Sequence, residues 1–263
     1  MNPMDVLALL IARTGSERLP GKVMLPILGK PMLSRQIERI GRASGFDRLL
    51  VATSTEPADD PIEGLCTELG LECFRGSLSD VADRCYRAAL RYQPWHVLKL
   101  SGDCPLADPD ALDSLIEFHE RGKFDYSSNA IRPTFADGLD AEIFTFDCLT
   151  EIAAGARLPS EREHLVPYIL RYGEKFRVGS LTQAIDRSHL RWTVDERCDF
   201  ELVNRVYEAL YPGNPAFTTG DIERFLADNP DVVKLNADLE RNAGVRRSVE
   251  ADASSAARSE TVA

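Results

Sequence analysis

The sequence predicts an α/β fold with a doubly wound, mostly parallel sheet and a small inserted α+β subdomain. Through residue 122, short apolar runs alternate with helical patterns, as in a chain of βαβ units. The first run, "DVLALLIA" (5–12), is continuously apolar after its leading acid, which is typical of a central strand buried on both faces of a parallel sheet. The 263 residues, 44% of them hydrophobic, are enough to bury a large core.

The elements of this first half are predicted from local patterns. Leu33, Ile37 and Ile40 recur at helical spacing, which predicts a helix. Gly70 is typical of a helix C-terminus, and Asp108 of a helix N-cap. The predicted strands are 5–12, 46–55, 71–76 and 95–103, and the predicted helices are 31–43, 60–70, 79–92 and 108–122.

After residue 122 the alternation is lost. Two runs, 124–129 and 141–147, are typical of strands without a full helix between them. Ser160 and Glu163 have the spacing of a capping box at a helix start. The later elements predicted are a helix over 160–173, a strand over 188–195 and a helix over 199–211. From Arg241 onward there is no aromatic residue and no periodic apolar face, so we expect a disordered tail over 241–263.

The composition excludes some classes of protein. A net charge of −11 argues against a nucleic-acid binder, which usually presents a basic face. The six cysteines include no C-x-x-C pair, as is typical of reduced thiols in a cytosolic protein. The apolar run near the N-terminus is too short for a membrane span and lacks the basic lead of a signal peptide. We therefore expect a soluble cytoplasmic protein with no nucleic-acid or membrane partner.

A basic loop, "RTGSERLPGK" (residues 13–22), follows the first predicted strand. Ligands in open α/β sheets bind beyond the carboxyl ends of the strands, which is where this loop begins. Gly15 and Gly21 permit tight turns and a close approach of backbone N–H groups to an anion. The side chains that supply positive charge for phosphate oxygens are Arg13, Arg18 and Lys22. The loop is therefore a candidate phosphate site, with a merely basic surface loop as the alternative.

The basic loop does not match the common nucleotide motifs. Five residues separate Gly15 from Gly21, and Val23 stands where a Walker A loop needs a hydroxyl for magnesium. No G-x-G-x-x-G is present, so a dinucleotide site lacks support. A metal, if the reaction uses one, must be held elsewhere in the chain.

Two aspartates at predicted strand ends are candidates for that metal site. Asp103 follows an apolar strand, and Asp195 ends another. Two carboxylates at the ligand-binding edge can hold one hard cation, most simply Mg²⁺, with water and phosphate oxygens completing its shell. Alternatively, Asp103 is a turn residue before Pro105 and Asp195 is a helix N-cap. The metal hypothesis requires Lys22, Asp103 and Asp195 to converge.

Eight stretches together resemble one known family. They are "ARTGSERLPGKVMLPILGKPML", "VATSTEPADDPIEGLC", "CFRGSLSDVADRCYRAA", "LSGDCPLADP", "DYSSN", "DGLDAEIF", "PSEREHLVPYI" and "HLRWTVD", and they span about residues 5–210. This set resembles the CMP-sugar synthetases, the cytidylyltransferases that activate 3-deoxy-manno-octulosonate and acylneuraminate, and within them the SpsF-type branch of spore-coat polysaccharide biosynthesis. One departure is "DERCDF" at 195–200, where the family often has D-T-P-E-D.

The resemblance implies a nucleotide-diphospho-sugar transferase-like, Rossmann-type fold. It implies a nucleotidyltransferase domain over residues 1–240, with an inserted acceptor and dimerisation segment at roughly 125–185, and a homodimer. The implied activity is Mg²⁺-dependent transfer from CTP to a sugar acid or related sugar, releasing pyrophosphate, for surface polysaccharide biosynthesis. A nucleotidyltransferase that uses a phosphorylated acceptor and a non-catalytic nucleotide-binding protein are the alternatives.

The resemblance also assigns residues to the parts of the site. The implied catalytic residues are Arg13, Lys22 and Asp103, and the implied metal ligands are Asp103 and Asp195. The implied nucleotide-binding residues are Ala12, Arg13, Gly15, Ser16, Arg18, Lys22, Thr53, Arg75, Asp80 and Gly102. The acceptor-binding candidates are Asp137, Asp140, Glu142, Arg162, His164 and Arg191.

Several of these residues have simpler explanations. Asp80 could cap helix 79–92, His164 could be an ordinary half-buried histidine, and Arg191 could form a surface ion pair. Alternation along a strand over 137–142 would place Asp140 and Glu142 on one face.

Overall fold

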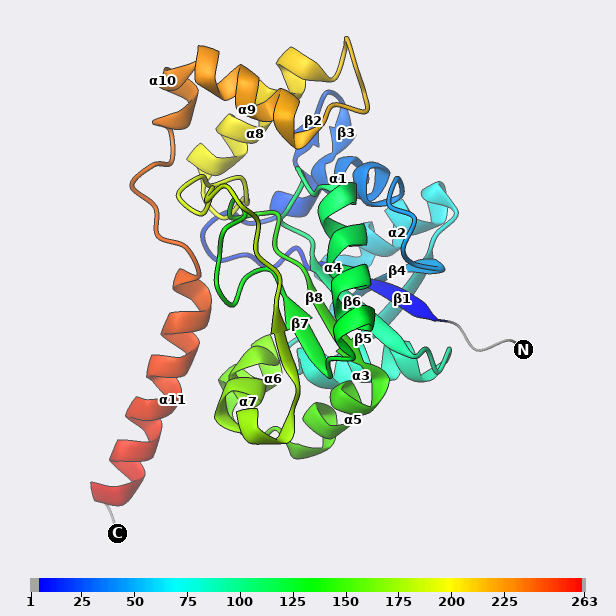
Figure 1. Cartoon of the computed structure of the whole chain (residues 1–263), viewed down its shortest axis with the longest axis vertical. Helices are drawn as coiled ribbons and strands as arrows, with labels where there is room; N and C mark the ends of the chain where they lie inside the picture. The colour runs from blue at the N-terminus through cyan, green and yellow to red at the C-terminus, as the bar shows by residue number, and fades with distance from the viewer. Residues whose placement is uncertain (1–4, 262–263) are drawn as a thin grey trace.

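The computed structural model describes residues 5–261, and within them a seven-stranded sheet forms the centre of the molecule (Figure 1). Its strand order is β5-β4-β1-β6-β8-β7-β9. The bounds are β1 (Val6–Ile11), β4 (Arg48–Ser54), β5 (Glu72–Gly76), β6 (His96–Ser101), β7 (Tyr126–Ser128), β8 (Glu142–Thr145) and β9 (Val178–Ser180). The strands from β5 to β6 are parallel, and β8 is antiparallel to both β6 and β7. The predicted doubly wound, mostly parallel sheet is confirmed.

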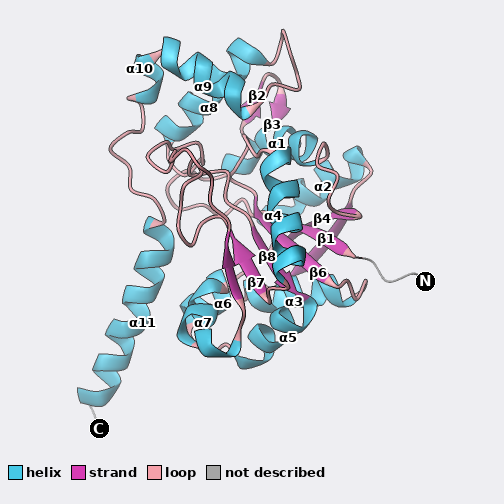
Figure 2. Ribbon diagram, in the orientation of Figure 1, coloured by secondary structure: helices cyan, strands magenta, loops and turns pink. Residues whose placement is uncertain are grey.

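Helices cover both faces of this sheet (Figure 2). They are α1 (Met32–Ile40), α2 (Asp60–Leu69), α3 (Val81–Leu90), α4 (Pro109–Gly122), α5 (Phe146–Gly155), α6 (Pro159–His164), α7 (Val166–Arg171), α8 (Arg197–Leu210), α9 (Thr219–Asp228), α10 (Pro230–Val233) and α11 (Ala243–Thr261). A hairpin of β2 (Pro26–Ile27) and β3 (Lys30–Pro31) precedes α1. Along β1, Ala8 and Leu10 belong to one core cluster and Leu7 and Leu9 to the other, so the apolar run is buried on both faces as predicted.

The strand order reverses next to β1, which lies between β4 and β6. The chain proceeds from β1 outward through β4 to β5, and then returns to the other side of β1 with β6. In open α/β sheets this switch point is where ligands bind, beyond the carboxyl ends of the strands. The basic loop leaves β1 at that edge, and Asp103 follows β6 there. The fold therefore places two parts of the candidate site side by side.

A buried arginine connects the first half of the chain to the last third. Arg39, on α1, is only 2% exposed. Its Nε donates to the carbonyl of Ala107 at 2.8 Å and its Nη1 to the carbonyl of Phe217 at 3.0 Å. The guanidinium also lies 4.3 Å from the centre of the Phe217 ring, at a cation–π distance. Helix α1 is thus fixed against the segment that precedes α9.

Three details of the second half differ from the sequence prediction. The expected strand 188–195 makes only a single bridge, between Asp137 and Arg191, although its backbone also donates N–H groups to the carbonyls of Asp137 and Asp103. The expected helix 160–173 is divided into α6 and α7 at Leu165, whose φ of 63° breaks the helical path. Its first turn is capped by Glu161, not by the Ser160–Glu163 pair, since Glu161 accepts the N–H groups of Arg157 and Leu158.

The expectation of a disordered tail over 241–263 is wrong for most of that segment, which forms the helix α11. Residues 262–263 of the expected tail lie outside the described residues. Polar contacts to α6 hold this helix, which explains why no apolar stripe signalled it. Asp252 accepts the N–H of Ser160 at 3.1 Å, and Ser248 lies 3.1 Å from His164 Nε2. Figure 1 shows α11 beside α6, with its C-terminal end projecting from the body of the molecule. Within residues 5–261, no helix is long and apolar enough to cross a membrane.

Candidate active site

The basic loop is fixed by hydrogen bonds at both of its ends. Gly21, with φ of 70°, donates its N–H to the carbonyl of Thr14 at 2.9 Å. Thr14 donates its own N–H to Asp59 Oδ1 at 2.7 Å, and its hydroxyl to the same oxygen at 2.8 Å. Burial alone would raise the pKa of Asp59, but the hydrogen bonds from Ser54 and Thr14 outweigh it and lower this pKa. Asp59 therefore stays ionised and holds the loop in a closed turn.

Lys22 lies directly between the two aspartates proposed as metal ligands. Its Nζ is 3.0 Å from Asp103 Oδ2 and 2.9 Å from Asp195 Oδ1. Burial lowers the pKa of Lys22, but the two carboxylates outweigh burial and leave this pKa above its usual value. Burial likewise raises the pKa of Asp195, but Lys22, Arg18 and Arg191 together lower it to about 2. The three side chains converge as the sequence analysis expected.

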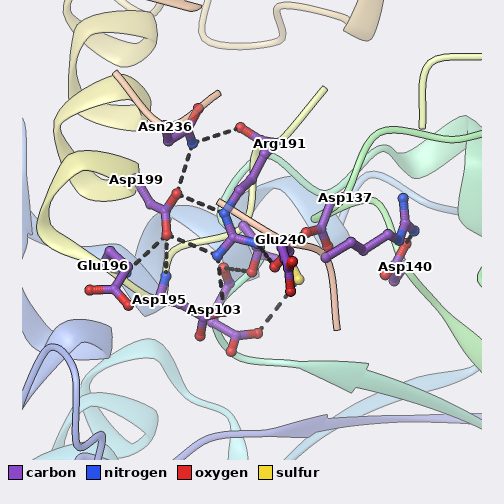
Figure 3. Close-up of polar contacts among 12 residues, drawn as sticks. Asp103, Asp137, Asp140, Arg191, Asp195, Glu196, Asp199, Asn236 and Glu240 are labelled. Carbon is purple, nitrogen blue, oxygen red and sulfur yellow. Dashed lines mark hydrogen bonds and ion pairs between the residues drawn. The ribbon is translucent and has the colours of Figure 1, made fainter. Parts of the chain in front are cut away.

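Arg191 is the centre of a cluster of carboxylates next to Lys22 (Figure 3). It contacts Asp137 at 2.8 Å, Asp195 at 3.1 Å and Asp199 at 2.9 Å. Only 8% of Arg191 is exposed, so the alternative of a surface ion pair is wrong. Burial lowers the pKa of this guanidinium, but the hydrogen bonds and charges of the aspartates outweigh it and raise the pKa. Arg191 neutralises aspartates that would otherwise repel one another.

Asp199 fixes the backbone of Asp195 by accepting a hydrogen bond from it. Its Oδ2 accepts the backbone N–H groups of Asp195 and Glu196, both at 2.9 Å. Glu196 is the N-cap residue of α8, so the alternative that Asp195 caps this helix is wrong. Asn236 donates to Asp199 Oδ1 at 2.7 Å and to the carbonyl of Arg191 at 3.1 Å. The side chain of Asp195 is therefore free of a capping role and is aimed at Lys22 and Arg18.

Gly102 and Ala12 allow β1 and β6 to approach each other where the site begins. A Cβ on Gly102 would lie 2.9 Å from the Cβ of Ala12 and 3.0 Å from the carbonyl oxygen of Ile11. No side chain fits there without displacing backbone. At the end of β4, Thr53 is fully buried, and its hydroxyl has no partner among the described residues. The small size of Gly102 and Ala12 is thus explained by the close packing of β1 and β6. The buried hydroxyl of Thr53, by contrast, can still form a hydrogen bond with a ligand next to the loop after β4.

The structure gives three of the nucleotide-binding candidates local structural contacts. Ser16 Oγ accepts the N–H of Leu19 at 3.3 Å within the basic loop. Arg75 donates to the carbonyls of Ser54 and Glu56, both at 2.9 Å, and so braces the segment after β4. Asp80 is the N-cap of α3, accepting the N–H of Asp83 at 2.9 Å, as the simpler explanation held. Gly15 has open space around its Cα, with nothing within 4 Å of an added Cβ.

The acidic acceptor candidates each have a basic partner. Asp137 contacts Arg191, Asp140 pairs with Arg241, and Glu142 pairs with Lys99. Burial raises the pKa of Asp140 to about 7, although Arg241 opposes the shift. Strand β8 begins only at Glu142, so the expected alternation over 137–142 is not present. The acidic groups are distributed over a loop and a strand start, not over one strand face.

The remaining acceptor candidates lie on α6. Arg162 pairs with Asp80 and donates to the carbonyl of Ala153 at 2.6 Å. His164 is half-buried, and burial lowers its pKa. Its neighbour Glu163 lies 3.3 Å from Arg13, so α6 contacts the basic loop directly. This contact joins α6 to the candidate phosphate site.

Sequence reasoning missed several residues that organise the site. Lys99 interrupts the apolar strand β6, and a lysine inside such a run signals a buried partner, here Glu142. Asp59, Asn236 and Arg241 carried no local signal, because each contacts residues far along the chain. The missed residues with direct contacts to site residues are Asp59, Lys99, Asp199, Asn236 and Arg241.

Comparison with known proteins assigns the chain to a family. The model of a family described as cytidylyltransferase matches residues 7–207. The chain belongs to the cytidylyltransferase family. This assignment confirms the resemblance that the motifs indicated, and it makes the protein a nucleotidyltransferase. The basic loop, Asp103 and Asp195 all lie within the matched region.

Individual relatives agree with this assignment. The chain is 30% identical over 235 residues to the spore coat polysaccharide biosynthesis protein SpsF of Bacillus subtilis, covering 86% of this chain and 96% of that one. It is 34% identical over 130 residues to the 8-amino-3,8-dideoxy-manno-octulosonate cytidylyltransferase of Shewanella amazonensis, covering 48% and 52%. A solved cytidylyltransferase structure from Leptospira borgpetersenii has a TM-score of 0.82 and 34% identity, covering 88% and 97%. The fold and the family are therefore supported independently.

Proposed function

We propose that this cytidylyltransferase uses CTP and Mg²⁺ to activate a sugar acid or a related sugar, giving a CMP-sugar and pyrophosphate for surface polysaccharide biosynthesis. The observation that carries the proposal is the convergence of Lys22, Asp103 and Asp195 at the switch point of the sheet. Among the relatives, the Shewanella amazonensis protein bears the name of an enzyme that acts on a sugar acid of this class.

The two aspartates fit a magnesium ion. Their oxygens are hard donors, and Mg²⁺ is usually bound by one or two carboxylates together with substrate phosphates and water. Within residues 5–261, no group of three or more histidine, cysteine or acidic side chains is arranged as a complete metal cage. A site of two carboxylates that relies on the triphosphate for further ligands is consistent with both facts. The ion supplies charge neutralisation at the phosphate that is attacked.

The chain's own residues supply the remaining electrostatics. Lys22 and Arg18 both contact Asp195, so positive charge is held at the place where the phosphates are expected. Arg13 extends from the same loop and is 42% exposed at its side chain, which leaves it accessible to a ligand. Preorganised cations of this kind stabilise the charge that develops as pyrophosphate leaves. The attacking oxygen comes from a hydroxyl of the acceptor, so no covalent enzyme intermediate is needed.

The acceptor side favours a hydroxyl-rich sugar over a phosphorylated acceptor. Basic groups there are already paired with carboxylates, since Arg191 contacts three aspartates and Lys99 pairs with Glu142. A phosphate would need at least two cations that are not already neutralised in this way. Carboxylates are, by contrast, suitable acceptors for sugar hydroxyls.

The decisive experiment is a pyrophosphate-release screen. The common nucleoside triphosphates are each combined with Mg²⁺ and with a panel of sugar acids and sugar phosphates. We expect release with CTP and a sugar acid, and its loss in Asp103→Asn. Asp186→Asn, an exposed aspartate outside the site, is the matched control. Release only with sugar phosphates would replace the proposal by the phosphorylated-acceptor alternative, and CTP binding without release would favour a non-catalytic protein.

The setting of the reaction is also part of the proposal. All six cysteines are free thiols, which supports a cytoplasmic location. A homodimer through the segment 125–185 is supported by β9, an end strand of the sheet, and by Leu170, which is 64% exposed on α7. Light scattering of the purified chain tests the dimer, and a monomer at all concentrations would contradict it.

A further inference from the structure

A segment beyond the region matched by the family model runs along the acceptor side of the site. We call residues 236–252 the strap, and the family match ends at residue 207. The strap begins at Asn236, which is only 4% exposed and donates to Asp199 and to the carbonyl of Arg191. The carbonyl of Glu240, further along the strap, accepts from Arg191 at 3.5 Å. The start of the strap is thus attached to the carboxylate cluster (Figure 3).

The far end of the strap is attached to α6. Ser248 donates to Glu163 at 3.3 Å and lies 3.1 Å from His164. Asp252 accepts the N–H of Ser160 at 3.1 Å. The strap is therefore held at both ends by the two segments that flank the acceptor side, and the residues between these anchors cross from one segment to the other.

Arg241 lies in the crossing part and turns inward. Its Nη2 pairs with Asp140, and its Nη1 donates to the carbonyl of Phe135 at 3.0 Å. Its Nε is buried and has no partner among the described residues. Since a guanidinium carries several N–H donors in a planar fork, these contacts leave donors for a further acceptor. The side chains of Arg241 and Asp140 remain partly exposed, at 15% and 24%.

Arg241 lies beside the candidate metal site. It follows Glu240, whose carbonyl accepts from Arg191, and Arg191 in turn contacts Asp195. Burial raises the pKa of its partner Asp140 to about 7, although Arg241 opposes the shift. Arg241 is therefore a cation near the candidate site whose contacts leave N–H donors for a ligand.

Arg191 is more fully occupied than Arg241. It contacts three aspartates, and all of these contacts are buried or partly buried, so a ligand that bound it would have to break three ion pairs. Arg162 has the same kinds of partner as Arg241, one carboxylate and one carbonyl. Among the described residues, however, Arg241 has a buried N–H without a partner and Arg162 does not. Arg241 can bind a carboxylate through its remaining N–H donors or by exchanging its contact with Asp140.

We propose that Arg241 is a specificity-determining residue that binds the carboxylate of a sugar-acid acceptor, and that the strap presents it to the site. This inference rests on the proposed function. It assigns a role to a residue outside the matched region of the family. It also explains why a segment without an apolar face is held so closely against α6 and the carboxylate cluster.

The test compares Arg241→Gln, Arg241→Lys and the control Arg246→Gln. Arg246 is an exposed arginine of the same strap that pairs with Glu240, so it controls for loss of a strap arginine. Each protein is assayed with CTP, Mg²⁺ and 3-deoxy-manno-octulosonate, and with the amide of that acid. Binding of the acid in the presence of CMP is measured by calorimetry, so that one readout does not depend on turnover.

We expect Arg241→Gln to raise the KM for the acid at least about tenfold, and to leave the KM for CTP and the midpoint of thermal unfolding near the wild-type values. The preference for the acid over its amide should fall by the same factor, with partial recovery in Arg241→Lys. An equal rise in KM for the acid and for its amide, which would leave the preference between them unchanged, would overturn the role of Arg241. If the wild type binds the acid but releases no pyrophosphate, the proposed function is wrong, and Arg241 is judged by binding alone. If the wild type does not bind the acid at all, both proposals are wrong.

Discussion

Lys22 Nζ lies 3.0 Å from Asp103 Oδ2, although 81 residues separate the two along the chain. Their proximity follows from the sheet, because β1 and β6 are neighbours and each delivers one residue to the same edge. A lysine at this position keeps two carboxylates from repelling each other. It also adds charge beside the expected triphosphate.

The first prediction concerns Lys22 itself. Lys22→Met should lower turnover by at least about tenfold, since it removes one preorganised cation from the transition state. Pyrophosphate release at saturating CTP and acceptor measures this loss. Lys30→Met, on the exposed hairpin strand β3, is the control and should retain the wild-type rate. An unchanged rate in Lys22→Met would remove Lys22 from the catalytic residues.

The second prediction concerns the metal. Chelation with EDTA should stop turnover and added Mg²⁺ should restore it. In Asp195→Asn, the Mg²⁺ concentration for half-maximal rate should rise by about tenfold or more, because one hard ligand is lost. Asp186→Asn should follow the wild-type titration. Full activity after exhaustive chelation would contradict a metal-dependent reaction.

The third prediction concerns Gly138, which follows Asp137 in the carboxylate cluster. Its φ of 103° is rarely adopted by other residues, and a Cβ would lie 2.4 Å from the backbone nitrogen of Thr193. Gly138→Ala should therefore lower the free energy of unfolding by about 2 kcal/mol or more, measured by urea denaturation. Gly173→Ala, where nothing lies within 4 Å and φ is not in the left-handed range, should change it little.

The fourth prediction concerns pH and stability. His119 is fully buried, with its ring nitrogens 3.2 Å from His96 and 3.0 Å from Ser127. Burial, with a smaller contribution from His96, lowers the pKa of His119 to about 3. The unfolded chain binds a proton near pH 6.5 that the folded chain does not. The contribution of His119 to the free energy of unfolding is therefore fully present above about pH 6.5. It is lost as the pH falls below that value, by about 2 kcal/mol at about pH 5.

Urea denaturation across this pH range measures the effect. His119→Asn should weaken the acid-dependent loss, even if it lowers stability overall. His189→Asn, at an exposed histidine, should preserve the wild-type slope. The same slope in His119→Asn as in the wild type would show that another group is responsible.

The sequence predicted correctly those elements whose signal lies in neighbouring residues, and it failed where an element is held by residues far along the chain. The continuous run of β1 and the N-cap at Asp108 are local, and both are confirmed. Helix α11 has no apolar stripe and is held by polar contacts to α6, so the composition of this segment pointed to disorder. The predicted strand around Arg191 failed for a similar reason. Arg191 forms ion pairs with Asp137 and Asp199, and the backbone after it bonds to the carbonyls of Asp137 and Asp103, which lie outside the strands. Periodicity registers neither kind of contact.

The same distinction applies to the site. Lys22, Asp103 and Asp195, which the structure brings together, were proposed because each stands at an abrupt end of an apolar run or within a family motif. The acceptor side was predicted with less detail, since its acidic residues are matched by cations from elsewhere in the chain. Lys99 for Glu142 and Arg241 for Asp140 could be assigned only after the chain was folded.

The contact of Arg39 with the carbonyl of Phe217 has a consequence for synthesis on the ribosome. The two residues are 178 positions apart, so α1 emerges from the exit tunnel long before one of its two carbonyl partners is made. Burying a guanidinium without its hydrogen-bond partners is strongly disfavoured. The core around Arg39 is therefore unstable in a nascent chain that has not yet reached residue 217. We therefore expect the packing around α1 to be completed only after residue 217 has been synthesised.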